Sequence, residues 1–244
     1  WEKYEEELHN RLGSDKKIVR FLTNRAKESP KRIIYAEADH LDVLKAAQIV
    51  LEEGIGHPIL LGNREVIEEL KKEIEFDEDV PIIDPKSKEE LSNRNKYGEK
   101  YWEIRKRKGV TLFRAVNKMK ERNLYAAMML QNGDADALIS GYSRSYPVTV
   151  KPIFEVIGRA SGVNRVATTN LMITSKGPLF LSDTSINIDP SAKDLAIIAK
   201  MTSDAVKMFG LEPNVAMVSY SNFGSSNHPM ALKVNEAVMY LHRN

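Results

Sequence analysis

The chain has 244 residues, which allows one large domain or two modest ones with a real hydrophobic core. Its 36 basic and 34 acidic side chains leave a net charge of +2, which argues against a nucleic-acid partner, because nucleic-acid-binding proteins carry a marked basic surplus. The sequence contains no cysteine, which excludes disulfides, thiolate zinc sites and cysteine nucleophiles, and its five histidines are scattered, which disfavours a metal site. It contains neither an apolar run of about 20 residues nor a signal peptide, so we expect a soluble, cytoplasmic protein without a membrane partner.

The ends of the sequence suggest a piece of something larger. The chain begins at Trp1 rather than at methionine, and residues 230–244 have the pattern of a helix that is cut short. Residues 1–30 are expected to form a helical lead-in, with an apolar stripe over residues 1–12 and a second helix over residues 16–29 that stops at a proline.

Strands and helices then alternate. The pattern predicts three strands, at residues 31–37, 57–62 and 80–84. Asp39 and Asn63 are placed to cap the two helices between them. Such a β-α-β-α-β order predicts a parallel sheet with helices on both faces.

A long polar helix is predicted at residues 87–108, and it ends in the basic run 105–108. That run is either a solvated helix end, where cations favour the carboxyl-terminal dipole, or part of an anion site. Thr111 is expected to cap the next helix. Residues 124–130 are expected to be buried helix, and residues 135–139 a short strand.

The loop that follows, residues 140–147, is the most informative stretch. It lies where ligands bind in α/β proteins, after the carboxyl end of a strand. It offers hydroxyls, backbone donors and one cation, from Ser140, Gly141, Ser143, Arg144, Ser145 and Tyr146. These groups suit a phosphate or an acyl carbonyl, although a polar, capped strand-to-helix turn would have a similar composition.

A second α/β part is expected from residue 146 onward. We expect helices at 150–160 and 191–209 and strands at 165–174, 179–187 and 214–220. Asp189 is predicted to cap the second helix, with Pro190 in its first turn. Two more strand-end loops, 182–190 and 219–229, are rich in polar groups. The loop 219–229, with backbone N–H groups, hydroxyls and a glycine just before a helix, suits an anion, but the sequence contains neither GxxxxGK nor GxGxxG. Asp183 could act as acid or base, or simply accept hydrogen bonds within its loop.

Several of these stretches together resemble the phosphate acetyltransferase and phosphate butyryltransferase family. The resemblance is carried by GDADALISG (133–141), by LFLSDTSINIDPSAKDLAIIA (179–199) and by FGLEPNVAMVSYSNFGS (209–225). It extends to residues 32–48, 57–63 and 105–111, in the family's order. The resemblance implies two three-layer α/β/α domains with an intervening cleft, as in isocitrate and isopropylmalate dehydrogenases. It divides the chain into the lead-in 1–30, a first domain 31–145 and a second, incomplete domain 146–244.

The family moves an acetyl group between coenzyme A and inorganic phosphate, and this chain departs from its active members. Lys151 and Pro152 stand where active members have Arg-Pro, and Phe223 stands where they have lysine. A lysine keeps the charge but loses the bidentate fork of arginine. The family's C-terminal part, with its catalytic Ser-Arg pair and Asp, is also not in the chain. The loop YSRSYP and the stretch SYSNFGS are more similar to one branch, the transferase-like C-terminal half of bacterial NADP-dependent malic enzymes.

The resemblance therefore implies a regulatory, acetyl-CoA-binding module of a malic enzyme, whose NADP and divalent metal would belong to the other half of that enzyme. An active phosphate acetyltransferase and a purely structural dimerisation domain are the alternatives. Coenzyme A, acetyl-CoA and phosphate are the expected ligands, with no cofactor or metal in this domain. The candidate ligand-binding residues are Arg105, Ser140, Ser143, Arg144, Tyr146, Thr149, Lys151, Asp183, Asn187, Ser221, Asn222, Gly224 and Ser225.

A homodimer or higher homo-oligomer is also expected. The helix over residues 191–209 carries apolar side chains beyond one stripe, so a second face should be covered, by a partner subunit or by further chain.

Overall fold

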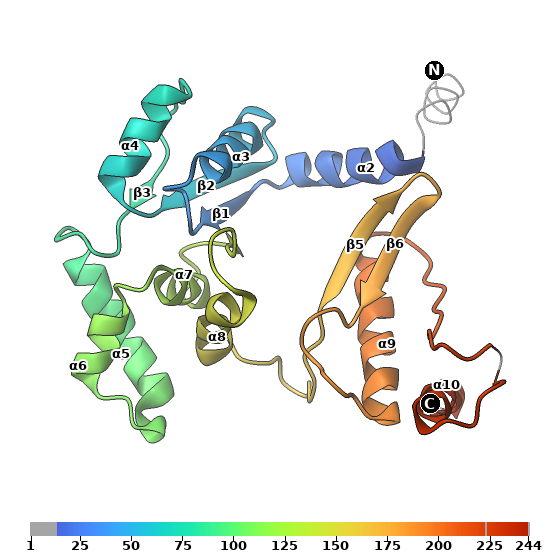
Figure 1. The fold of residues 1–244 in the computed structure, drawn as a ribbon. Helices are drawn as coiled ribbons and strands as arrows, with labels where there is room; N and C mark the ends of the chain where they lie inside the picture. The colour runs from blue at the N-terminus through green and yellow to red at the C-terminus, as the bar shows by residue number, and fades with distance from the viewer. Residues whose placement is uncertain (1–13, 223, 244) are drawn as a thin grey trace, which may run out of the picture. The chain divides into compact units, whose positions relative to one another are not determined.

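The computed structural model describes residues 14–222 and 224–243. The chain forms two compact units: Thr23–Gly158 make up one, and Arg159–Asn244, with the described residues up to Leu22, make up the other. We call them the sheet unit and the hairpin unit (Figure 1). Helix α2, Ser14–Glu28, confirms the helix predicted at 16–29 and contributes residues to both. The stripe predicted at residues 1–12 lies outside the described residues.

The sheet unit contains a four-stranded parallel sheet in the order β3-β2-β1-β4. Its strands are β1 (Lys31–Tyr35), β2 (Gly56–Leu61), β3 (Ile82–Ile83) and β4 (Ala137–Ile139). In the register of the central strand, Ile34 lies beside Ile59 of β2 and Leu138 of β4. The parallel sheet predicted from the alternating elements is confirmed, and its last strand is the one that precedes residues 140–147.

Helices cover both faces of this sheet. They are α3 (Leu41–Glu52), α4 (Arg64–Glu73), α5 (Leu91–Arg105), the 3₁₀ turn η1 (Lys106–Lys108), α6 (Leu112–Lys118), α7 (Arg122–Gln131) and α8 (Tyr146–Val156). Successive side chains of a strand point to opposite faces, so Ile34 of β1 enters the core beneath α5 to α8 while Tyr35 enters the core beneath α3 and α4. Both side chains are buried, at 0% and 2% exposure.

The predicted helix caps are partly confirmed. The side chain of Asn63 accepts from the N–H groups of Glu65 and Val66, and that of Thr111 accepts from Arg114. Asp39 is not a cap: residue 40 is the N-cap of α3, without a side-chain hydrogen bond. The Asp39 carboxylate instead pairs with both terminal nitrogens of Arg122, at 2.7 and 3.0 Å, because the fold brings the start of α7 beside it.

Helix α8 belongs to the sheet unit, whereas the sequence-based boundary fell just before it, between residues 145 and 146. Val156 is buried in the core with α5 and α7, and Tyr101 of α5 donates a 2.7 Å hydrogen bond to Glu155. The unit therefore ends after the helix, at Gly158.

The hairpin unit has a simpler construction. Strands β5 (Thr169–Thr174) and β6 (Gly177–Ser182) form an antiparallel pair, followed by α9 (Ala192–Met208) and α10 (Pro229–Arg243). Helix α9 packs against β6 and α10, and the rings of Phe180 and Phe209 meet edge to face at 5.3 Å. The α/β class is confirmed, but the described part of this unit has a two-stranded sheet rather than three layers. The dehydrogenase-like cleft stays a prediction.

Two local predictions in this unit are wrong. Residues 214–220 form no strand in the described chain; they border an apolar hollow of about 460 Å³ beside β6 and α9, and Val218 is 85% exposed. Asp189 does not cap α9. Ser191 does so in a capping box with Asp194, and Asp189 pairs with the distant Lys233 instead.

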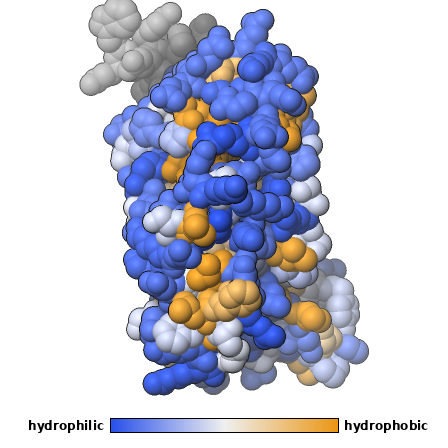
Figure 2. All heavy atoms as spheres, turned by 90° about the vertical axis from the view of Figure 1, so that its left-hand side faces the viewer, coloured by the Kyte–Doolittle hydropathy of each residue, from blue (hydrophilic) through white to orange (hydrophobic). Residues whose placement is uncertain are grey.

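Within residues 14–222 and 224–243, no helix is long and apolar enough to cross a membrane. Figure 2 shows one face of the molecule, which is mainly polar with small, separate apolar patches. Among the exposed apolar side chains, Phe113 at the start of α6 is 78% exposed.

Candidate ligand-binding site

The predicted site residues divide between the two units. The sheet unit holds Arg105, Ser140, Ser143, Arg144, Tyr146, Thr149 and Lys151, and the hairpin unit holds Asp183, Asn187, Ser221, Asn222, Gly224 and Ser225. Each set has its own geometry within its unit. The assembly of the two sets into one cleft, and their contact with any ligand, stay predictions.

In the sheet unit, residues 140–145 form what we call the strand-end loop, which connects β4 to α8. Its backbone wraps around the carboxylate of Glu37, which is 1% exposed and lies just beyond β1. The N–H groups of Gly141 and Tyr142 donate to one carboxylate oxygen at 2.8 and 3.2 Å, and that of Ser143 donates to the other at 2.7 Å. The hydroxyl of Ser143 also donates to Glu37, at 2.5 Å, and the single proton of the Ser140 hydroxyl is shared between Glu37 (3.2 Å) and Oδ1 of Asn123 (2.9 Å).

These hydrogen bonds decide the charge state of Glu37. Burial by itself raises the pKa of the carboxyl, but the hydrogen bonds from Ser143, Gly141 and Ser140 outweigh burial and lower the pKa to about 2. Glu37 is therefore ionised at neutral pH. The sequence pattern assigned these loop donors to an external phosphate or carbonyl, but in this structure they bind an internal anion.

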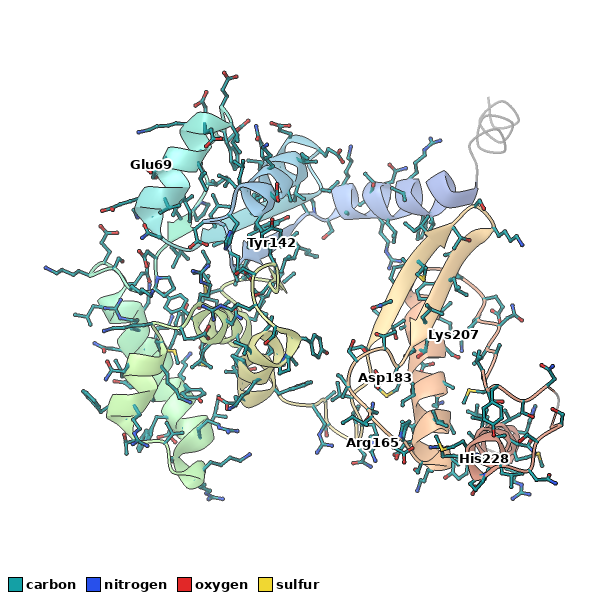
Figure 3. All side chains as sticks on the ribbon, viewed as in Figure 1. Glu69, Tyr142, Arg165, Asp183, Lys207 and His228 are labelled. Carbon is teal, nitrogen blue, oxygen red and sulfur yellow. The ribbon has the colours of Figure 1, made fainter. Side chains whose placement is uncertain are left out.

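Other side chains of the strand-end loop also contact the surrounding helices. The Tyr142 hydroxyl donates to Asp42 at 2.6 Å and its ring lies 5.3 Å from that of His40, both at the start of α3 (Figure 3). Arg144 pairs with Glu121, the N-cap of α7, at 2.8 Å. The Arg144 side chain is still 34% exposed, so a ligand can reach it.

The start of α8 carries three more of the predicted residues. Thr149 is buried and donates to the carbonyl of Ser145 at 3.3 Å, so its hydroxyl stabilises the turn. Tyr146 is 43% exposed and Lys151 is exposed. Of these three, Tyr146 and Lys151 are accessible to a ligand.

Arg105 is neither a solvated helix end nor a fully buried group. Its side chain is 19% exposed, its guanidinium lies 3.7 Å from Glu155 of α8, and its buried Nε has no hydrogen-bond partner among the described residues. Lys118 lies 3.9 Å from the same carboxylate. Two cations thus share one carboxylate, which leaves a net positive charge that suits an anion.

In the hairpin unit, Asp183 organises the loop after β6 (Figure 3). Thr168 donates its N–H and hydroxyl to one oxygen at 2.8 and 2.7 Å. Asn187 donates its N–H and side-chain amide to the other at 2.7 and 2.6 Å. Burial raises the pKa of Asp183, but these four bonds hold it well below its usual range. Asp183 is therefore a structural acceptor and a poor general base.

Of the remaining predicted residues, Ser221, Asn222 and Gly224 line a hollow of about 460 Å³ beside α10, and Ser225 does not line it. Its polar wall includes Ser219, Ser221, Asn222 and Gly224, and aliphatic side chains of α10 form the opposite side. The Ser221 hydroxyl accepts from the N–H of Ser226 at 3.1 Å and lies 3.4 Å from the Ser225 hydroxyl. This hollow offers hydroxyl and amide groups but no cation among its described lining residues.

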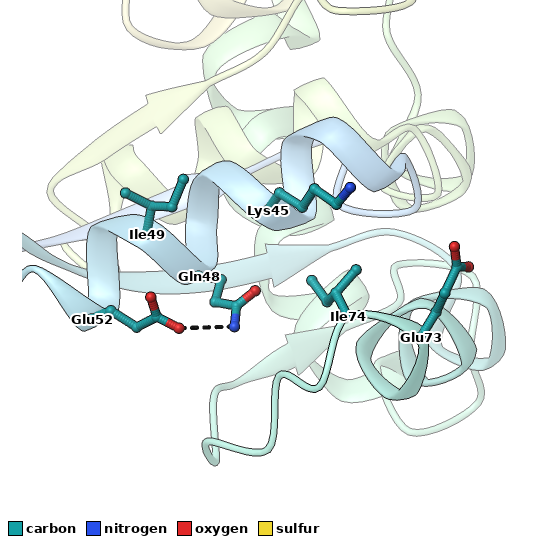
Figure 4. Close-up of a pocket in the computed structure, with 6 residues that line it drawn as sticks. All are labelled: Lys45, Gln48, Ile49, Glu52, Glu73 and Ile74. Atoms are coloured by element: carbon teal, nitrogen blue, oxygen red, sulfur yellow. Dashed lines mark hydrogen bonds between the residues drawn. The ribbon is translucent and has the colours of Figure 1, made fainter.

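A further hollow of about 440 Å³ lies between α3 and the end of α4 (Figure 4). It is lined by Lys45, Gln48, Ile49, Glu52, Glu73 and Ile74. Gln48 is already bonded to Glu52 at 2.8 Å, and none of the predicted site residues reaches this hollow. The described residues also contain no cluster of His, Asp and Glu that could hold a metal ion.

Comparison with known proteins shows the family. The family described as phosphate acetyl/butaryl transferase matches residues 17–244, so the chain belongs to that family, as its motifs predicted. It is 35% identical to the NADP-dependent malic enzyme of Haemophilus influenzae over 98% of this chain and 32% of that protein. It is 33% identical to the phosphate acetyltransferase of Thermoanaerobacterium thermosaccharolyticum over 90% of this chain and 68% of that protein.

Solved structures agree with this assignment. The EutD phosphotransacetylase from Staphylococcus aureus superposes with a TM-score of 0.82 and 27% identity, over 94% of this chain and 68% of that one. The chain thus spans about a third of the malic enzyme of H. influenzae and about two thirds of the T. thermosaccharolyticum and S. aureus proteins.

Sequence reasoning missed two residues that organise the site, Glu37 and Glu155. Glu37 is the one carboxylate at the end of the apolar run KRIIYAE, and a charged residue at the end of a buried strand is a signal that could have been used. Glu155 gave no comparable signal, because an acidic residue is ordinary on a helix surface.

Proposed function

We propose that this chain is a phosphate acetyltransferase-like domain of an NADP-dependent malic enzyme (oxaloacetate-decarboxylating), and that it binds acetyl-CoA as a regulatory and oligomerisation module. The observation that carries the proposal is the state of Asp183. A transferase needs a base to help deprotonate the coenzyme A thiol. Asp183 accepts four hydrogen bonds and has a lowered pKa, so it favours binding over catalysis.

The cations of the sheet unit support an acyl-CoA ligand. Arg105 and Lys118 share Glu155, and Arg144 is partly exposed at the strand-end loop. Coenzyme A carries several phosphates, and charge-assisted bonds from arginine are the strongest bonds that a protein side chain offers a phosphate.

An active phosphate acetyltransferase is the second candidate. It is favoured by the relative from T. thermosaccharolyticum, which bears that name and is matched over 68% of its length. A purely structural dimerisation domain is the third, and it predicts no affinity for acetyl-CoA.

Two measurements on the purified protein, with all of its natural sequence, separate these candidates. Acetyl-CoA binding is measured by calorimetry, and phosphate-dependent release of coenzyme A is followed with a thiol reagent. We expect acetyl-CoA to bind and to change the rate of malate-dependent NADP reduction, with little release of coenzyme A. Robust phosphate-dependent release of coenzyme A would overturn the proposal that the domain is only regulatory. If acetyl-CoA does not bind, only the structural dimerisation domain is left as a candidate.

The departures from active members give a gain-of-function control. Lys151→Arg with Phe223→Lys restores the residue types that the resemblance implies for active members. A rise in phosphate-dependent turnover in this double variant would identify the two positions as the reason for low activity.

A further inference from the structure

Glu37 is unusual among the buried side chains of the sheet unit. It is 1% exposed, and in the described chain it takes part in no ion pair. Burying an unpaired charge is costly unless hydrogen bonds compensate. Here the compensation comes from the strand-end loop, through three consecutive backbone N–H groups and two hydroxyls. Consecutive N–H groups that converge in this way form an anion-binding nest.

The loop backbone is shaped to fit this carboxylate. Gly141 has a φ of +107°, which a residue with a side chain rarely adopts. Because glycine adopts a positive φ without a steric penalty, Gly141 allows the loop to turn its N–H groups toward the carboxylate.

We propose that Glu37 is a positioning residue that holds the strand-end loop, and with it Tyr142, Arg144 and the start of α8, in the form that binds an acyl-CoA. The proposal rests on the proposed function, because it takes the strand-end loop as part of the acyl-CoA site. Glu37 itself faces the loop backbone and contacts no ligand. Its contribution is that the loop is ordered before the ligand arrives, so that binding does not have to supply the ordering free energy.

The test compares Glu37→Gln with Asp136→Asn in the purified natural-length protein. The Glu37→Gln substitution keeps the side-chain volume but removes the charge, and it places an NH₂ group against loop N–H groups. Asp136 is the matched control: its carboxylate also bonds β1, through Arg32, but at the amino ends of β1 and β4. Acetyl-CoA affinity is measured by calorimetry. The exchange rates of the backbone amide hydrogens of residues 141–143 are measured with and without acetyl-CoA.

We expect Glu37→Gln to speed amide exchange in the loop and to weaken acetyl-CoA binding about tenfold or more, since several bonds to a charged acceptor are lost. Saturating acetyl-CoA should restore most of the loop protection in this variant, which a general loss of stability would not do. Asp136→Asn should change neither the amide exchange rate in the loop nor the affinity for acetyl-CoA. Gly141→Ala removes no side-chain contact with a ligand but strains the loop, so it should also speed loop exchange and weaken acetyl-CoA binding. If Glu37→Gln does not fold, this variant is used for the test in its place.

Unchanged affinity in Glu37→Gln despite faster loop exchange would overturn the proposal and leave the proposed function intact. An amide exchange rate in the loop of Glu37→Gln that equals the wild-type rate would also overturn the proposal. Wild-type protein that fails to bind acetyl-CoA would overturn the proposed function, and this proposal with it, and that result is recognisable before any variant is compared.

Discussion

The carboxylate of Glu155 on α8 lies 3.7 Å from the guanidinium of Arg105 at the end of α5. The same carboxylate accepts a 2.7 Å hydrogen bond from Tyr101 and has Lys118 at 3.9 Å. Glu155 therefore ties three helices together.

Arg105→Ala tests whether that cation serves a ligand. If Arg105 contacts a phosphate of acetyl-CoA, its loss should cost about 1.5–3 kcal/mol, or roughly ten- to a hundredfold in affinity. The measurement is calorimetry with acetyl-CoA. Arg107→Ala, in the exposed turn η1, is the control and should bind as wild type.

Glu155→Gln should not weaken acetyl-CoA binding, in contrast to Arg105→Ala. It removes the carboxylate charge beside Arg105 but keeps an acceptor for Tyr101, so acetyl-CoA should bind as well as to wild type or more tightly. If Arg105→Ala binds normally and Glu155→Gln binds worse, then Arg105 has only a structural role.

Asp183→Asn should destabilise the protein in a pH-dependent way. The pKa of Asp183 is lowered in the folded state, so its contribution to stability is present above the unfolded pKa of about 4 and is lost as the pH falls through the folded value. Replacement by an amide turns one of the two acceptor oxygens into an NH₂ donor that faces the donors of Thr168 or of Asn187, and should cost about 1–3 kcal/mol at pH 7. Denaturant unfolding of both proteins from pH 7 towards pH 2 should show the difference shrinking.

Asp189→Asn is the control for that experiment. The Asp189 side chain is 73% exposed and pairs with Lys233 at the surface. Surface pairs contribute about 0–1 kcal/mol, so this variant should stay close to wild type. An Asp183→Asn variant as stable as this control would show that the four hydrogen bonds contribute nothing net.

Gly98→Ala tests the packing of α5 on α6. Alanine is normally favoured over glycine inside a helix by about 1 kcal/mol. At this position, however, an added Cβ would lie 2.7 Å from the Cα and Cγ2 of Val116. We expect the cost of overpacking to exceed the gain in helix propensity and to lower the free energy of unfolding by about 1–3 kcal/mol. Adding Val116→Ala relieves only the Cγ2 clash and should recover part of the loss, whereas a stabilised single variant would mean that the helices separate freely.

Oligomerisation is the remaining prediction, and the structure removes part of the evidence for it. Part of the apolar face of α9 that suggested a partner is covered within the chain by α10. If a homodimer forms nevertheless, it should bury roughly 1,200 Å² or more in total. Sedimentation velocity of the natural-length protein from about 1 to 50 micromolar should then show a dimer or larger species; a monomer throughout would rule out the oligomerisation role.

Local signals were sufficient for the elements of the sheet unit. The alternation of apolar strands with capped helices predicted the parallel sheet, and the caps by Asn63 and Thr111 involve N–H groups only two or three residues away. Interactions at such short separation depend on neighbouring residues alone, so a sequence pattern can specify them.

The tertiary structure decided which partner each carboxylate has. Asp39 and Asp189 both fit a cap by position, yet their partners are 83 and 44 residues away in the sequence, so only the fold brings them together. The residues 214–220 have the apolar pattern of a strand but no ladder partner in the described chain. Above all, Glu37 binds loop amides more than 100 residues away. The sequence by itself determined the family, the sheet and the polar composition of the strand-end loop; only the fold, which brings the ends of β1 and β4 side by side, decided that this loop surrounds a buried anion.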